Sequence, residues 1–300
     1  MKFPDFDYRA PASLDEALDT LAALGSDAKV LAGGQSLLPT MRYGLARPAV
    51  LVDLKRVPAL RGRQVRDDGI SFGAMTTHAD LARGAPDTPL ASLLAAHAAQ
   101  IAFPAVRTQG TVGGSLVHAD PAGDWPLLFS ALNAAVELRS LRGRRAAALR
   151  DFIQGPLTTE IEIDELLTSI MLDADHAGLT AWGRAKLMHR AGEYAATSAV
   201  ALRRASGQWS CWIMAPSTGP RAAAGCAALL DAASPDSSQP GAARPDAARP
   251  GAARPDTARL MRQAMEDIAR MLPDEPAVAH HRHAANLVRA IEQAREYRHD

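Results

Sequence analysis

The sequence predicts a protein of the α+β class. Short apolar or β-branched runs bounded by glycine and proline indicate strands, and longer stretches with apolar residues at helical spacing indicate helices. The chain has 300 residues, of which 47% are hydrophobic. That length supports a buried core and is typical of two packing units. We therefore expect a first domain over residues 1–175 and a smaller one over 180–300.

The first domain is expected to combine strands with a few helices. Thr77 followed by Asp80 indicates a helix cap, and Pro89 to Ile101 predicts a helix that ends near Phe103. A glycine-punctuated passage through Trp182 and Gly183 leads into the second domain. The strand-like runs of the first domain are 49–54, 69–74 and 165–172.

The second domain is expected to begin with strands at 197–202 and 209–215 and to become helical from Arg221 onward. Its last two helices are predicted at 257–272 and 277–296. Between them and the strands, prolines recur every five residues in segment 232–256. No α-helix can run through prolines at that interval, so we expect a disordered surface loop, with an arginine-bearing docking arm as the alternative.

Composition excludes several classes of function. Thirty-three basic residues balance 33 acidic ones, and no basic block interleaved with aromatics follows a phosphate backbone, so nucleic acid is not an expected partner. We find no secretory signal and no 18-residue apolar run, and expect a cytoplasmic protein without a membrane span. Cys211 and Cys226 are too few to hold an iron–sulfur cluster, so any such centre belongs to another chain.

The first motif with chemical content is a short strand that runs into a double-glycine turn. Glycines let successive N–H groups point into one concavity, which fits a pyrophosphate. A purely structural turn is the alternative. The motif lacks the Gly-Lys-Ser/Thr of a P-loop and the three glycines of the dinucleotide fingerprint, so a nicotinamide-binding Rossmann domain is disfavoured. Its residues are Lys29, Val30, Leu31, Ala32, Gly33, Gly34, Gln35, Ser36 and Leu37.

The second motif covers 107–125, a span whose propensities predict a loop. It gathers glycines, hydroxyl groups and the carboxylates Asp120 and Asp124, and acidic residues commonly hold ribose hydroxyls in nucleotide sites. Two glycine-rich nests far apart in the chain indicate one extended dinucleotide held by both. The candidate contacts at the start of this motif are Gly110, Thr111, Val112, Gly113, Gly114 and Ser115.

The two motifs, AGGQSLLPTMRYGLARP and RTQGTVGGSLVHADPAGDWP, are followed in order by DFIQGPLTTE and ELLTSI. In this combination the chain resembles the FAD-binding medium subunit of the molybdenum hydroxylases, the xanthine dehydrogenase and aerobic carbon monoxide dehydrogenase family. The resemblance implies that residues 1–175 form a bipartite FAD-binding domain of the vanillyl-alcohol-oxidase type, with lobes of 1–58 and 59–175. It also implies that 180–300 form the smaller C-terminal α+β domain of that subunit.

The resemblance implies roles for single residues around a non-covalently bound FAD. Val30 to Leu37 would wrap the pyrophosphate, and Thr111 to Ser115 would form a second clamp. Asp124 corresponds to an acid near the ribose. Leu167 corresponds to a backbone contact on the adenine side, and Ile101 to an apolar position beside the cofactor.

Two further residues match positions that the family keeps near the isoalloxazine, Lys186 and Tyr194. The surrounding sequence departs from the family pattern over 182–189, and Glu193 replaces a common aspartate. Residues 213–221 stand where the family has a Gly-Gly-Val turn before a Pro-x-Arg pair, a departure that concerns partner docking more than cofactor binding.

Several histidines and cysteines have a chemical and a structural interpretation. His78 and His118 lie in or beside the motifs and approach the flavin in one interpretation, and hydrogen-bond locally or face solvent in the other. A metal site is not expected from the histidines at 280, 281 and 283, because a helix spreads them over different faces. The two cysteines are expected to be buried thiols, and Trp125 and Trp182 to be packing residues.

The resemblance implies a relay of electrons. A molybdenum cofactor on a large partner oxidises the substrate, and [2Fe–2S] clusters on a small partner pass electrons to FAD on this chain, which delivers them to an external acceptor. The three chains would form a dimer of heterotrimers, with no catalytic acid or base on this one. The alternatives are a standalone flavin-dependent oxidase or dehydrogenase and a flavin-free assembly scaffold.

Overall fold

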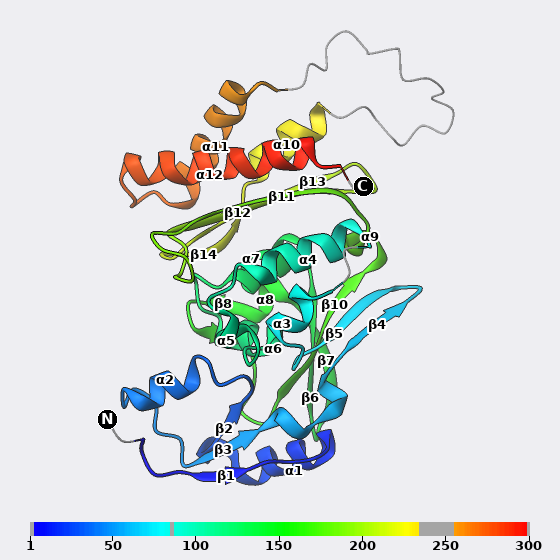
Figure 1. Ribbon diagram of the computed structural model, residues 1–300, viewed down its shortest axis with the longest axis vertical. Coiled ribbons are helices and arrows are strands. Elements are labelled where there is room, and N and C mark those ends of the chain that lie inside the picture. Colours follow the sequence, from blue (N-terminus) through cyan, green and yellow to red (C-terminus); the bar gives the residue numbers. More distant parts are fainter. Residues whose placement is uncertain (1–2, 85–86, 234–254, 299–300) are drawn as a thin grey trace. The chain divides into compact units, whose positions relative to one another are not determined.

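The computed structural model of the protein describes residues 3–84, 87–233 and 255–298 (Figure 1). Contacts within the chain define two compact units. Unit 1 comprises residues 1–86, 91–120 and 133–174, and unit 2 comprises 87–90, 121–132 and 175–300. Both units mix helices and strands, so the predicted α+β class is confirmed.

Unit 1 begins with a three-stranded parallel sheet of order β1-β3-β2. Helix α1 (Leu14–Leu24) is capped by the Ser13 hydroxyl, which accepts a hydrogen bond from the Glu16 amide. Its buried face, which includes Leu18 and Leu21, packs with Val52 of β3. Helix α2 (Leu37–Arg42) follows β2 directly. The strands are β1 (Asp7–Arg9), β2 (Ala28–Leu31) and β3 (Val50–Asp53), and the 3-10 turns are Gly25–Asp27, Leu54–Arg56 and Pro58–Leu60.

A second, five-stranded antiparallel sheet of order β4-β5-β10-β6-β7 forms the rest of the framework of unit 1. Phe72, Val136, Leu138 and Ile170 point into its core and are at most 1% exposed. The predicted strands at 49–54, 69–74 and 165–172 are confirmed as β3, β5 and β10. The strands of this sheet are β4 (Arg63–Arg66), β5 (Gly69–Gly73), β6 (Ala135–Ser140), β7 (Gly143–Ala148) and β10 (Leu166–Asp173).

Short helices and one small hairpin complete unit 1. The Thr77 cap is confirmed, because Thr77 and Asp80 form a reciprocal capping box at the start of α3. The helix predicted from Pro89 is also confirmed, although it ends at Ala99. The elements are α3 (His78–Ala82), α4 (Pro89–Ala99), α5 (Pro104–Arg107), α6 (Val112–His118), α8 (Leu149–Phe152), β8 (Ile153–Gly155) and β9 (Thr158–Thr159).

The glycine-rich span 107–125 was expected to be a loop, and this expectation is wrong. It contains the end of α5, all of α6 and the start of α7 (Asp124–Ala131). Thr111 caps α6 by accepting from the Gly114 amide. A Cβ on Gly113 would stand 2.6 Å from the Ala74 Cβ. Close packing therefore requires a glycine inside this helix, and local propensity alone does not reveal that.

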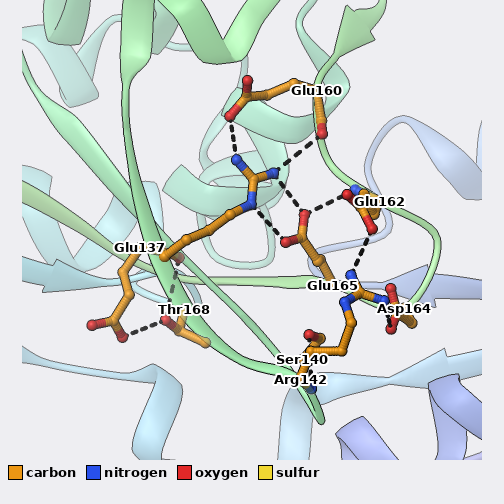
Figure 2. A network of polar contacts seen from close by, with 9 residues as sticks. Glu137, Ser140, Arg142, Glu160, Glu162, Asp164, Glu165 and Thr168 are labelled. Carbon is orange, nitrogen blue, oxygen red and sulfur yellow. Dashed lines mark hydrogen bonds and ion pairs between the residues drawn. The ribbon is translucent and has the colours of Figure 1, made fainter.

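Two arginines of the β6–β7 hairpin hold the segment that leads into β10 (Figure 2). Arg145 donates from Nε and Nη2 to both carboxylate oxygens of Glu165, at 2.7 and 2.8 Å, and from Nη1 to Glu160. Arg142 bridges Glu162 and Asp164 in the same segment. Hydrogen bonding from Arg145 lowers the pKa of Glu165, so the carboxylate stays charged although its side chain is only 4% exposed.

Unit 2 is built on a four-stranded antiparallel sheet of order β11-β12-β13-β14. Helices α10, α11 and α12 cover one face (Figure 1), and Cys211 and Cys226 lie in that core as buried free thiols, as predicted. The predicted strands at 197–202 and 209–215 are confirmed as β12 and β13, and the last two predicted helices as α11 and α12. The chain becomes helical only at Ala224, because Arg221 lies in strand β14, which pairs with β13. The elements of this region are β11 (Leu179–Leu187), β12 (Thr197–Arg204), β13 (Trp209–Ala215), β14 (Gly219–Ala222), α9 (Ala174–Ala177), α10 (Ala224–Ala232), α11 (Thr257–Met271) and α12 (Ala277–Glu296).

The glycine-punctuated passage through Trp182 and Gly183 is a regular strand, β11, and not an irregular connection. A Cβ on Gly183 would overlap the Ala290 carbonyl oxygen and stand 2.5 Å from the Ala294 nitrogen. The glycine therefore allows α12 to approach the strand closely. Of the predicted loop 232–256, residues 234–254 lie outside the described residues. Ala232 still belongs to α10, and Asp256 caps α11.

No helix in the ranges that the structure describes is long and apolar enough to cross a membrane. Trp125 and Trp182 are buried and each contacts another aromatic ring, Phe129 and Tyr297 respectively, so their predicted role in packing is confirmed.

Candidate flavin site

The first glycine motif joins β2 to α2 and presents backbone amides that the protein itself does not use. Within residues 3–84, 87–233 and 255–298, no hydrogen bond is donated by the N–H groups of Gly33, Gly34, Gln35 or Ser36. Gly34 has a φ of 72°, a left-handed conformation that glycine adopts without strain. Successive unused amides in such a turn fit an anionic group such as a pyrophosphate.

The second glycine motif differs, because most of its amides are already engaged. Val112 donates to the Thr76 carbonyl at 3.0 Å and Gly113 to the Ala74 carbonyl at 2.9 Å, while Gly114 donates to the Thr111 hydroxyl. The Ser115 amide donates to the Thr111 carbonyl. What this motif can offer a ligand is therefore mainly the hydroxyl groups of Thr111 and Ser115 and a close backbone approach.

The two motifs lie in direct contact within unit 1. A Cβ on Gly33 would overlap the Gln109 carbonyl oxygen and stand 2.7 Å from the Gly110 Cα. A Cβ on Gly114 would stand 3.2 Å from the Ala32 Cβ. The two glycine motifs predicted to form one site are thus adjacent, and the absence of side chains on their glycines is what permits this approach, although among the described residues only the first motif keeps its amides unused.

His78 packs against the second glycine motif at Gly110. Its amide donates to the Gly110 carbonyl at 3.0 Å, and its Nε2 would lie 2.6 Å from a Cβ on Gly110. Burial, and to a lesser extent the charge of Arg107, lowers the pKa of His78 to about 4. The imidazole is therefore neutral near pH 7 and packs against the motif, and the solvent-facing alternative is wrong for His78.

Other predicted contacts are distributed over unit 1. Leu167 is 4% exposed and lies where the register of β10 against β6 shifts. Ile101 is half-buried at the end of the α4 connection, and its carbonyl accepts from Arg107. Asp120 is half-buried and is the last residue of the segment 91–120 of unit 1. Their contacts with the cofactor stay predictions.

In unit 2, Lys186 and Asp124 form a buried ion pair. Lys186 Nζ lies 2.8 Å from Asp124 Oδ2, and the side chains are 3% and 10% exposed. Burial raises the pKa of Asp124, and Lys186 opposes that shift. Arg184 lies near the same carboxylate, and burial lowers its pKa while Asp124 opposes it. One carboxylate thus serves two cations.

Sequence reasoning assigned Asp124 and Lys186 to separate parts of the cofactor and did not select Arg184 as a site residue. The signal for Arg184 was present, because residues two apart on a strand point to the same face. Tyr194 lies in the connection between β11 and β12 and is 62% exposed. The roles of these residues toward the flavin stay predictions.

The histidines near the C-terminus have local partners. His283 Nε2 lies 3.0 Å from Glu275 Oε2, and His280 Nε2 contacts the Leu272 carbonyl oxygen at 2.6 Å. Both hydrogen bonds hold the turn between α11 and α12. These contacts support the structural interpretation of the two residues.

Residues 4–173 match the family model described as the FAD-binding domain in molybdopterin dehydrogenase. The chain belongs to this FAD-binding family of the molybdopterin dehydrogenases. The predicted family, the FAD cofactor and the oxidoreductase class are thereby confirmed. The adjacent glycine motifs with their unused amides lie inside the matched residues.

Relatives of known activity agree with this assignment. The nicotine 6-hydroxylase medium subunit of Paenarthrobacter nicotinovorans is 41% identical over 194 residues, which are 65% of this chain and 67% of that protein. The carbon monoxide dehydrogenase medium chain of Hydrogenophaga pseudoflava is 39% identical over 204 residues, 68% and 71% of the two chains.

Solved structures extend the similarity to almost the whole chain. Quinoline 2-oxidoreductase from Pseudomonas putida 86 matches with a TM-score of 0.83 and 29% identity, covering 98% of both chains. The carbon monoxide dehydrogenase from Hydrogenophaga pseudoflava matches with a TM-score of 0.81 and 30% identity, again over 98% of both. The similarity therefore includes unit 2 of this FAD-binding chain.

Proposed function

We propose that this chain is the flavoprotein subunit of a molybdenum hydroxylase, which accepts electrons from [2Fe–2S] clusters of a partner onto FAD and passes them to an external acceptor. The observation that carries the proposal is the run of unused amides at 33–36 beside the second glycine motif, in a chain of the molybdopterin dehydrogenase family. Bound FAD supplies the redox chemistry, since a flavin accepts and releases electrons singly or in pairs.

The chain's own residues bind and orient the cofactor in this proposal. The amides of 33–36 hold the pyrophosphate, and the hydroxyl groups of Thr111 and Ser115 approach it from the second motif. Ile101 is the apolar position beside the cofactor, and Leu167 offers a backbone contact on the adenine side. Asp124, near the ribose, and Lys186, near the isoalloxazine, are the further contacts proposed for the cofactor. No side chain is required to hold or move a proton as a catalytic group.

The cysteines support placing the iron–sulfur clusters on another chain. The sequence has only Cys211 and Cys226, and each is at most 2% exposed. Burial raises the pKa of both thiols, whereas thiolates are the ligands that clusters need. We therefore place the clusters on a separate subunit.

The partners follow from what the relatives are called. Several are medium chains or subunits, and one solved carbon monoxide dehydrogenase is described as lacking the Mo-pyranopterin moiety of its molybdenum cofactor. We infer a small iron–sulfur subunit and a large molybdenum subunit, assembled as a dimer of heterotrimers in the cytoplasm. The oxidised substrate would then bind to the large subunit.

Affinity purification of the tagged chain from its native host tests this proposal. Flavin absorbance together with iron, molybdenum and two co-purifying chains is the expected result. Flavin that is bleached directly by an organic substrate, with no partner chains, would support a standalone oxidase or dehydrogenase instead. A colourless chain that still brings down both partners would indicate an assembly scaffold.

A further inference from the structure

Arg107, the last residue of α5, folds back onto the segment that precedes its own helix. Its Nη1 donates to the Ile101 carbonyl at 2.9 Å and to the Ala102 carbonyl at 3.0 Å. The N-cap residue of α5, Phe103, makes no side-chain capping hydrogen bond. A single guanidinium therefore ties both ends of this short connection together.

The segment that Arg107 holds is strained. Ala102 has a φ of 42°, in the left-handed region that alanine adopts only at a cost in free energy. Such a conformation persists only where the surroundings fix it. Two hydrogen bonds from one charged donor to consecutive carbonyls, one of them that of Ala102 itself, are the contacts that fix this turn.

The charge of Arg107 has no carboxylate partner among the placed residues, although the side chain is half-buried. Partial burial of a guanidinium costs desolvation energy, which polar partners must offset. For Arg107 these partners are the carbonyl oxygens of Ile101 and Ala102. The neighbouring group is His78, which is neutral near pH 7 for the reasons given above. A second cation next to Arg107 is thus avoided.

The helix that Arg107 anchors leads directly into the glycine-rich motif. Two residues after Arg107, the carbonyl oxygen of Gln109 lies against Gly33, and Gly110 lies against His78. The Gly110 amide also donates to the Val106 carbonyl within the same turn, at 2.7 Å. Any change in the orientation of α5 therefore moves the backbone that forms the floor of the first nest.

We propose that Arg107 is a positioning residue for the flavin site. By holding the left-handed turn at Ala102, it fixes α5 and so the position of the Gln109–Gly110 backbone against Gly33. This inference rests on the proposed function of the site, but it does not require Arg107 to touch the cofactor.

A double-mutant cycle in the full-length chain tests the inference. The variants are Arg107→Gln, Ala102→Gly and their combination, each stripped of flavin and titrated with FAD. Arg107→Gln is expected to weaken FAD binding on the order of 10- to 100-fold, because hydrogen bonds from a charged donor are lost. With glycine at 102 the left-handed turn carries no penalty, so the same loss shrinks to about threefold or less.

The matched control is Arg61→Gln. Arg61 also donates to a backbone carbonyl, that of Lys55 at 3.1 Å, but on an exposed surface of the same unit. FAD affinity of this variant is expected to equal that of the wild type. Should Arg107→Gln fail to fold, Arg107→Lys keeps the charge but loses the fork of donors, and it is expected to bind FAD less tightly and to recover when combined with Ala102→Gly.

If Arg107→Gln lowers FAD affinity equally in the wild-type and Ala102→Gly backgrounds, the inference is overturned. Such a result would indicate that Arg107 acts on FAD by direct contact or through its charge. An unchanged affinity in Arg107→Gln would overturn it as well. If the wild-type chain bound no FAD, the proposed function would fail, and amide exchange would still test Arg107. Protection at Gln109 and Gly110 must then fall in Arg107→Gln and return in the double variant.

Discussion

Gly33 lies so close to Gln109 that a Cβ on the glycine would overlap the carbonyl oxygen of the glutamine. This approach brings together two motifs that are far apart in the sequence, and it places amides without a protein acceptor next to a rigid backbone floor. The proposed flavin site in unit 1 therefore depends on a close approach of two backbones, which glycine permits, more than on side chains.

Gly33→Ala is expected to weaken FAD binding by about tenfold or more, since overpacking against backbone costs roughly 1–3 kcal/mol and shifts the first nest. Titration of the flavin-free chain with FAD measures the effect. Gly155→Ala is the matched control, because a Cβ at that glycine meets nothing within 4 Å. Equal affinities of the two variants would contradict the packing argument.

Gly183→Ala is expected to destabilise unit 2 by about 2 kcal/mol or more, because the new methyl group meets the backbone of α12 at Ala290 and Ala294. Denaturant unfolding followed by tryptophan fluorescence reports the loss, since Trp182 is adjacent. A denaturation midpoint equal to that of the wild type would mean that α12 does not pack closely against β11 at Gly183.

The buried pair Lys186–Asp124 is expected to respond unequally to removal of its two partners. Asp124→Asn removes the carboxylate that lies beside both Lys186 and Arg184, and breaking such a buried pair costs roughly 3–5 kcal/mol. Lys186→Met leaves Asp124 with Arg184 and is expected to cost less. Urea unfolding of both variants gives their free energies of unfolding. A larger loss of stability in Lys186→Met than in Asp124→Asn would contradict the idea that Asp124 interacts with both cations.

His78 is expected to make stability depend on pH. Burial lowers its pKa from 6.5 to about 4, so between these values the unfolded chain binds more protons than the folded one. Its contribution is fully present above about pH 6.5 and is lost as the pH falls toward 4, with an upper bound of about 3 kcal/mol.

Replacing His78 by glutamine should flatten the stability profile between pH 4 and 6.5 relative to wild type. Measuring the unfolding free energy across that window provides the test. His281→Gln, at an exposed position of α12, serves as the control and should leave the profile unchanged. A wild-type profile that is flat in this window would show that His78 is protonated as readily in the fold as in the unfolded chain.

The two hairpin arginines in Figure 2 are expected to differ in importance. Arg145→Gln leaves Glu165, whose side chain is 4% exposed, without its bidentate partner. The expected loss is about 1–3 kcal/mol, less than for a fully buried pair because the Arg145 side chain is 39% exposed. Arg142→Gln is expected to destabilise the protein much less, because the ion pairs of Arg142 lie on the surface. A melting temperature that falls further in Arg142→Gln than in Arg145→Gln would contradict this difference.

Local sequence signals predicted the elements that local physics determines. The capping box of Thr77 and Asp80, the strand at β3 and the amphipathic pattern of α12 required no knowledge of distant residues. The double-glycine turn at 33–34 was recognised as a candidate nest from local signals alone, whereas the second motif forms the start of α6 and uses its amides within the protein. Family resemblance then supplied the cofactor, which composition alone did not specify.

The sequence misled where a distant residue decides the structure. The passage around Gly183 was not predicted as a strand, because the close approach of α12 that requires this glycine is not visible in the local sequence. Gly113 likewise lowers the helical propensity of α6, because Ala74 leaves no room for a side chain. Arg184 and Arg107 were not selected as site residues, since their partners, Asp124 and the Ile101–Ala102 turn, become evident only once the chain is folded.

We propose that this chain carries FAD and receives electrons from an iron–sulfur partner. The most direct measurement is anaerobic mixing of the flavin-loaded chain with the reduced iron–sulfur subunit that co-purifies with it, followed by flavin absorbance. The reduced partner is expected to bleach the flavin, and an external acceptor is expected to restore its absorbance. If the reduced partner leaves the flavin oxidised, while an organic substrate bleaches it without any partner, this chain does not act as the electron-accepting subunit.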